Sequence, residues 1–146
     1  NAGDFLRVTL DNQLPDETTI HWHGIRLRNP ADGVPGMTQD PVKPETSYVY
    51  EFTAPDPGTY FFHPHVGVQL DRGLYAPLII DDPNEPGDYD IEWVLVLDDW
   101  IDGTGTTPDE VATAMTVARQ PSCQRGLSTD GTSPPDSAIR SSEGCE

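Results

Sequence analysis

The sequence predicts an all-β fold, a Greek-key sandwich or barrel of antiparallel strands. Fifteen prolines and thirteen glycines in 146 residues, against 35% hydrophobic residues, favour short strands joined by many turns. Runs of β-branched and aromatic residues recur at regular spacing with turn residues between them, which is typical of antiparallel sandwiches. The length suits one domain that buries a core, and no apolar run approaches the roughly 18 residues of a membrane span.

Six stretches are expected to be strands. Residues 5–10 alternate in part between apolar and polar side chains, and residues 47–52 are rich in tyrosine and valine. Residues 73–80 form a short apolar run bounded by charge, which is typical of a buried strand. In chain order, the six expected strands are 5–10, 17–28, 47–52, 58–65, 73–80 and 92–97.

The remaining segments are a long loop, a short helix and a tail. Residues 29–45 carry several prolines and glycines, and loops of this length in a compact domain are usually functional or disordered. One or two helical turns are expected over 108–115, where Asp109 and Glu110 suit the start of a helix. We therefore expect one domain over residues 1–115. Residues 116–146, rich in Ser, Thr, Gly and Pro, are expected to be a flexible tail or linker.

Two histidine pairs carry the strongest functional signal. His21 and His23 lie two apart in an expected strand, so they project from the same face. His63 and His65 repeat this spacing at the end of another aromatic strand, and the chain has four histidines in all. If the two strands are neighbours, four imidazoles converge on one patch. Copper and zinc accept neutral ring nitrogens, so the pattern predicts a metal site.

Charge and cysteine content set further limits. The formal net charge is -17, which repels phosphate backbones and makes nucleic acid an unsuitable partner. An acidic surface of this kind is otherwise typical of secreted or salt-adapted proteins. The two cysteines, Cys123 and Cys145, have no zinc or blue-copper motif around them. They would form a disulfide in an exported protein or remain thiols in the cytosol.

Four motifs then point to a family. Residues 19–24 (TIHWHG), 32–39 (DGVPGMTQ), 58–65 (GTYFFHPH) and 72–75 (RGLY) occur in the order seen in multicopper oxidases. From Ala2 to Trp100 the chain resembles the first cupredoxin domain of a bacterial laccase-like enzyme. The resemblance implies a cupredoxin-like Greek-key β-sandwich in a periplasmic or extracellular protein.

The resemblance also implies a role for each site residue. It assigns His21 to the type 2 copper and His23, His63 and His65 to the type 3 coppers. Asp32 matches a carboxylate near the cluster that helps to deliver protons to oxygen intermediates. The local alternative for Asp32 is a loop-capping aspartate before a glycine.

The family pattern is only half present. The family builds its trinuclear cluster from eight histidines, and its type 1 copper needs a cysteine flanked by histidines, so substrate oxidation is not expected within this chain. The missing ligands would come from the remaining cupredoxin domains of an oxidase or from a second copy of the chain. The opening at Asn1, without a signal-peptide pattern or the family's first strands, is interpreted as a mature, processed or cut chain.

Three functions remain open at this point. The chain is part of an oxidase that reduces oxygen to water while substrate is oxidised elsewhere, or a copper-binding module for storage, delivery or assembly. The third is a cupredoxin-like fold whose histidines bind no metal.

Overall fold

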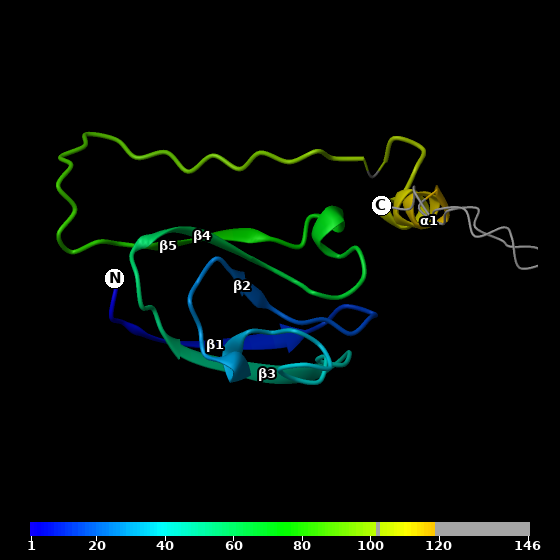
Figure 1. Ribbon diagram of the computed structural model, residues 1–146, viewed down its shortest axis with the longest axis horizontal. Helices are drawn as coiled ribbons and strands as arrows, with labels where there is room; N and C mark the ends of the chain where they lie inside the picture. Colours follow the sequence, from blue (N-terminus) through cyan, green and yellow to red (C-terminus); the bar gives the residue numbers. More distant parts are fainter. Residues whose placement is uncertain (102, 119–146) are drawn as a thin grey trace, which may run out of the picture.

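The computed structural model describes residues 1–101 and 103–118, and its strands form two antiparallel sheets (Figure 1). One sheet pairs β1 (Phe5–Asn12) with β3 (Thr46–Thr53), and the other has the order β2 (His21–His23), β4 (Gly58–His63) and β5 (Ala76–Ile80). The chain crosses from one sheet to the other after β1, after β2 and after β3. These crossings fit the predicted Greek-key sandwich, and the all-β prediction is confirmed.

The alternation of side chains in β1 and β3 gives their sheet an inner and an outer face. Leu6, Val8 and Leu10 are half-buried, whereas the residues between them are exposed. Tyr50 and Phe52 of β3 lie two residues apart, and the same alternation of side chains buries both of them. The inner face of this sheet therefore forms one side of the core.

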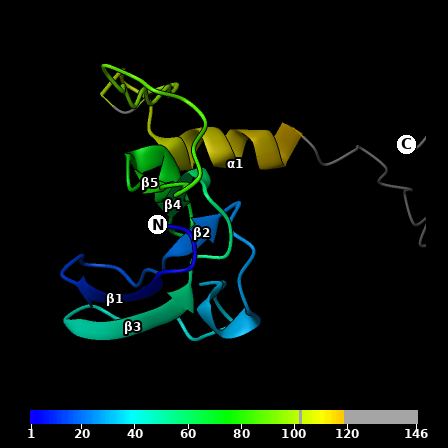
Figure 2. The ribbon, with the colours of Figure 1, turned by 90° about the vertical axis from the view of Figure 1, so that its left-hand side faces the viewer.

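Trp22 of β2 fills the space between the sheets, which are stacked as layers in Figure 2. Its ring centroid lies 4.9 Å from that of Phe52 in the facing sheet and 5.5 Å from that of Phe62 in its own sheet. Only 3% of Trp22 is exposed. Trp22 therefore packs in the core beneath the neighbouring histidines.

Strand β2 is much shorter than the predicted strand over 17–28, so that prediction is wrong in extent. Gly24 has φ +85°, a left-handed conformation that ends the extended chain, and the Ile25 N–H donates to the Trp22 carbonyl in the turn that follows. Before the strand, the Ile20 N–H donates to the hydroxyl of Tyr50 instead of to a neighbouring strand.

The predicted bounds of two other strands also differ from the structure. β4 ends at His63 because Pro64 follows and cannot donate to the ladder. β5 begins at Ala76. Gly73, in a left-handed conformation, caps the preceding 3-10 turn η2 (Leu70–Arg72), and Leu74 and Tyr75 connect this turn to the strand.

The predicted strand over 92–97 is not formed. The segment is extended but has no partner strand among the described residues, and Figure 1 shows it running apart from both sheets. Trp93, Leu95 and Leu97 are 77%, 77% and 94% exposed. β-propensity alone cannot form a strand, because the strand needs a neighbour to accept its hydrogen bonds.

The remaining elements are helical. η1 spans Asn29–Ala31, and α1 spans Pro108–Ala118, which confirms the expected helix and ends it later than Met115. Thr107 and Glu110 hydrogen-bond reciprocally across the first turn of α1, as a capping box.

The structure does not test the expectations for the cysteines and for the domain boundary. Cys123 and Cys145 lie outside the described residues, and the division at residue 115 stays a prediction. Among the described residues, no helix is long and apolar enough to cross a bilayer.

Candidate metal centre

The pairing of β2 with β4 brings the two histidine pairs together. His21 lies directly opposite His63 in this antiparallel ladder, and His23 lies opposite Phe61. His65 follows His63 by two residues, just beyond the end of β4. The predicted convergence of two neighbouring His-x-His segments is therefore confirmed.

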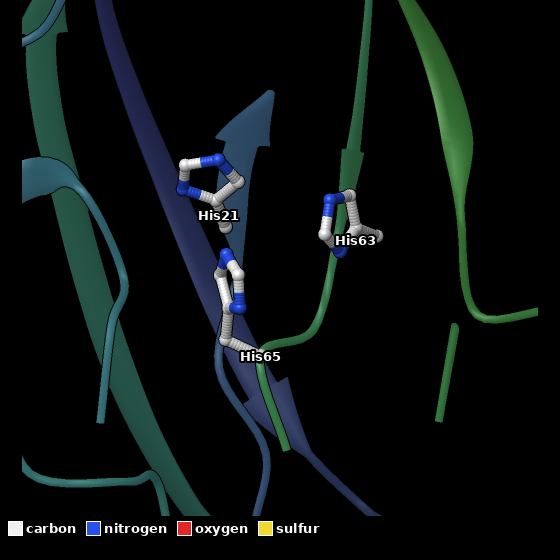
Figure 3. Close-up of side chains that lie close together, drawn as sticks. All are labelled: His21, His63 and His65. Carbon is white, nitrogen blue, oxygen red and sulfur yellow. The ribbon is translucent and has the colours of Figure 1, made fainter. Parts of the chain in front are cut away.

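Three imidazoles form the tightest group. One ring nitrogen from each of His21, His63 and His65 lies within 4.8 Å of the other two (Figure 3). The ring centroid of His21 is 4.5 Å from that of His65 and 5.4 Å from that of His63. A cluster of neutral nitrogen donors at these separations fits copper or zinc.

His23 adjoins this group at its exposed edge. Its Nδ1 lies 3.1 Å from Nε2 of His63, and its ring stacks on Phe61 with 4.4 Å between centroids. One of the two facing nitrogens must carry the proton that the other accepts. The stacking on Phe61 fixes the plane of the His23 ring beside the other three.

Backbone carbonyls set the tautomers of two of the rings. Nδ1 of His21 lies 2.8 Å from the carbonyl oxygen of Asp32, and Nδ1 of His63 lies 2.9 Å from that of Pro64. A carbonyl only accepts, so both Nδ1 atoms carry protons. Nε2 of each ring then carries the lone pair. In His63 this lone pair accepts the hydrogen bond from Nδ1 of His23, whereas hydrogen bonds from Nδ1 to a carbonyl are of the kind that orients metal-binding histidines. The donor set and its orientation fit copper.

Asp32 reaches the site with its side chain as well. Its Oδ1 lies 3.4 Å from Nδ1 of His21, and its side chain is 36% exposed. Gly33 packs against the backbone of Ile20 so closely that a Cβ at position 33 would lie 1.8 Å from the Ile20 carbonyl oxygen. The loop over 29–45 is thereby locked against the start of β2.

Burial and crowding make two of the imidazoles harder to protonate. Partial burial is the main cause, and neighbouring histidines add to it, so the pKa of both His23 and His65 lies below the ordinary 6.5. For His65 the nearby Asp32 carboxylate opposes this effect in part. Both rings therefore stay neutral, as metal binding requires, to lower pH than an isolated histidine.

These lowered pKa values predict that the metal-free chain loses stability as the pH falls below about 6.5. There the unfolded chain takes up protons on His23 and His65 that the folded chain resists, so acid favours unfolding. Thermal unfolding between pH 8 and pH 5 measures the effect. A His23→Gln, His65→Gln variant should lose less stability over this range, and an identical decline in both proteins would contradict the assignment.

Some residues that shape the site were not identified from the sequence. The hydroxyl of Thr19 accepts a hydrogen bond from the His65 N–H, and the hydroxyl of Tyr50 accepts one from the Ile20 N–H. In both cases the two residues are far apart in the sequence. Gly33 lies within one of the family motifs, yet no local sequence pattern indicates its close contact with Ile20. The four histidines lie together and Asp32 lies beside His21, while the copper-binding and proton-transfer roles of these residues stay predictions.

Comparison with known proteins decides the family. A family model described as multicopper oxidase matches residues 1–85, more than half of the chain. The chain belongs to the multicopper oxidase family. The oxidases of this family bind copper, which agrees with the imidazole cluster.

Individual multicopper oxidases are similar over most of this chain. Multicopper oxidase MmcO of Mycobacterium tuberculosis is 48% identical over 123 residues, which cover 84% of the chain and 24% of the relative. Laccase-1 of Cryptococcus neoformans is 41% identical over 108 residues, covering 69% and 17%. The chain therefore spans about a fifth of the length of these relatives.

Solved structures agree in fold. Lac15 from a marine microbial metagenome has a TM-score of 0.55 at 42% identity, covering 60% of this chain and 24% of that one. The two-sheet arrangement is thus the cupredoxin-like fold of multicopper oxidases.

Proposed function

We propose that this chain supplies four ligands to the trinuclear copper cluster of a laccase-like oxidoreductase. His21 binds the type 2 copper, and His23, His63 and His65 bind the type 3 coppers. The observation that carries the proposal is the register of β2 and β4, which sets His21 opposite His63 and gathers all four rings at one end of the sheet. Family membership and the conformity of four motifs support it.

The residues around the rings have defined tasks in this proposal. Bound copper supplies the electron transfer that reduces molecular oxygen to water. The carbonyl oxygens of Asp32 and Pro64 hold protons on Nδ1 of His21 and His63, so that Nε2 of each ring would be the nitrogen that binds copper. The half-exposed Asp32 carboxylate exchanges protons with solvent and passes them toward the cluster beside His21.

In this proposal the other histidine ligands of the cluster come from outside this chain. The family pattern needs eight histidines, and this chain has four. The remaining cupredoxin domains of the oxidase supply the rest in the favoured assembly, and a second copy of the chain does so in the alternative. Exposed apolar side chains at position 91 and at positions 93–97 favour a neighbouring domain that covers this segment. We place the protein in the periplasm or outside the cell.

A second candidate function is a copper-binding module for storage, delivery or assembly. The observation that favours it is the set of three ring nitrogens within 4.8 Å of one another, a donor set that could bind a metal ion without further domains. In that case copper binds but no turnover follows in any assembly.

Oxygen uptake separates the two functions. We expect the copper-loaded chain, assembled with the remaining domains or with a second copy, to consume oxygen with a phenolic substrate. Asp32→Asn should slow uptake about 100-fold or more while the copper content stays unchanged, because a positioned proton donor typically contributes that much. Full copper content without oxygen uptake in every assembly would support the copper-binding module instead. Unchanged uptake in Asp32→Asn would remove the proton role.

A further inference from the structure

The position of His65 is not fixed by the strand ladder. β2 and β4 pair through His21 opposite His63, and the pairing stops there. Continuing the same register by two residues on each strand would set Thr19 opposite His65. His65 therefore lies where the next backbone pair of the ladder would have been.

Two features explain why the ladder stops. Pro64 lies between the two histidines of the second pair and has no N–H to donate. On the other strand, the Ile20 N–H donates to the hydroxyl of Tyr50, at 2.8 Å, and so is already satisfied by the facing sheet. Ordinary backbone pairing cannot hold His65 against the first histidine pair.

A side chain replaces the missing backbone bond. The His65 N–H donates to Oγ1 of Thr19 at 3.1 Å, across 46 positions of the chain. Thr19 is 1% exposed, so water does not compete for this hydroxyl. Two residues further on from Thr19 is His21, whose ring centroid lies 4.5 Å from that of His65.

The preceding residue, Thr18, also forms a side-chain hydrogen bond, but its partner is not a histidine. Oγ1 of Thr18 donates to Oε1 of Gln69 at 2.7 Å, and Nε2 of Gln69 donates to the carbonyl oxygen of Glu17 at 2.9 Å. Thr18 is also buried, with 4% exposed. The two threonines are therefore chemically matched, but only Thr19 bonds to a histidine.

We propose that Thr19 is the positioning residue that holds His65 beside His21, by accepting a hydrogen bond from the His65 backbone at its hydroxyl. The expected effect of Thr19 on copper binding rests on the proposed function. The hydrogen bond itself does not depend on copper.

The hydroxyl is tested by a pair of variants that differ by one oxygen atom. Thr19→Ser keeps the acceptor and Thr19→Ala removes it, while both lose the methyl group. In the metal-free chain, hydrogen exchange of the His65 amide should quicken about tenfold or more in Thr19→Ala relative to Thr19→Ser, because the amide loses its partner. Copper affinity should fall about 10- to 100-fold in the same comparison, as for other groups that orient metal ligands.

Thr18→Val is the matched control. It removes a buried hydroxyl one residue away, so it should leave His65 exchange and copper affinity near those of the unmodified chain. A general loosening of this region would instead raise His65 exchange in Thr18→Val as much as in Thr19→Ala, and would overturn the proposal. Far-UV circular dichroism verifies that each variant is folded. If Thr19→Ala does not fold, His65 exchange in Thr19→Ser is compared with the unmodified chain, where unchanged protection supports the role and lost protection overturns it.

The two readouts separate this inference from the proposed function. If the unmodified chain binds no copper, the proposed function fails, yet His65 exchange still reports on Thr19. If copper binds but the Thr19→Ala and Thr19→Ser variants behave alike in both measurements, the positioning role is wrong and the copper assignment stands.

Discussion

Replacing Gly33 by alanine is expected to unfold or strongly destabilise the chain and to weaken its copper site. Gly33 has φ +74°, where a side chain costs about 1–3 kcal/mol. The new Cβ would also lie 1.8 Å from the Ile20 carbonyl oxygen, far inside the 3.0 Å below which real Cβ contacts essentially never occur. Relief requires the loop to move away from β2, which takes the Asp32 carbonyl away from His21. Urea unfolding and copper titration measure the two effects.

Gly36→Ala separates the clash from the backbone strain. Gly36 has φ +72°, almost the same as Gly33, but nothing lies within 4 Å of a Cβ there. We expect Gly36→Ala to lose only the cost of the left-handed backbone and to keep its copper affinity. Gly33→Ala should lose about 1–3 kcal/mol more, the usual cost of forcing extra atoms into a packed region. Equal losses in the two variants would mean that the loop is not locked against β2.

Replacing His63 and His65 together by alanine is expected to abolish copper binding at the site. His63 and His65 supply two of the three nitrogens that lie within 4.8 Å of one another, and the variant keeps only His21 and His23 as imidazole donors. Copper affinity, measured in competition with a chelator, should fall more than about 100-fold, beyond the loss caused by disturbing an orienting group.

An acidic pair provides the control for the histidine variant. The net charge of -17 attracts copper loosely over the whole surface. Asp88→Asn, Asp90→Asn alters two exposed carboxylates and should leave the tight site intact. Unchanged affinity in the histidine variant, with weaker binding in the acidic one, would assign the copper to carboxylates.

The part of the site that the sequence predicted rests on strand geometry. In an extended chain, residues two apart lie on the same face, so the spacing of His21 and His23 sets their side chains together. The same alternation determines the face on which His63 lies in its strand. Trp22, between the first two, must then point the other way, and it is buried in the core. Alternation therefore predicted the shared face of these histidines, and it also explains why Trp22 is buried.

Other features depended on long-range contacts that no local pattern encodes. The length of β2 is decided by Gly24 and by the bond from Ile20 to Tyr50, which belongs to the facing sheet. The bond between His65 and Thr19 arises because Pro64 interrupts the ladder. A sequence indicates which side chains share a face, but not which hydroxyl will replace a missing backbone bond.

The predicted strand over 92–97 failed for a different reason. Trp93, Leu95 and their neighbours have strong β-propensity, but propensity describes how a residue fits a sheet that already has a place for it. In the described residues no strand pairs with this segment. Its exposed apolar side chains are consistent with the proposed neighbouring domain.

A crystal structure of the copper-loaded chain, with anomalous scattering recorded at the copper absorption edge, tests the central claim most directly. We predict anomalous peaks within coordination distance of Nε2 of His21 and Nε2 of His63, with His65 and His23 turned toward the metal. Copper peaks on surface carboxylates, with none among the four imidazoles, would contradict the assignment of this chain as half of a copper cluster.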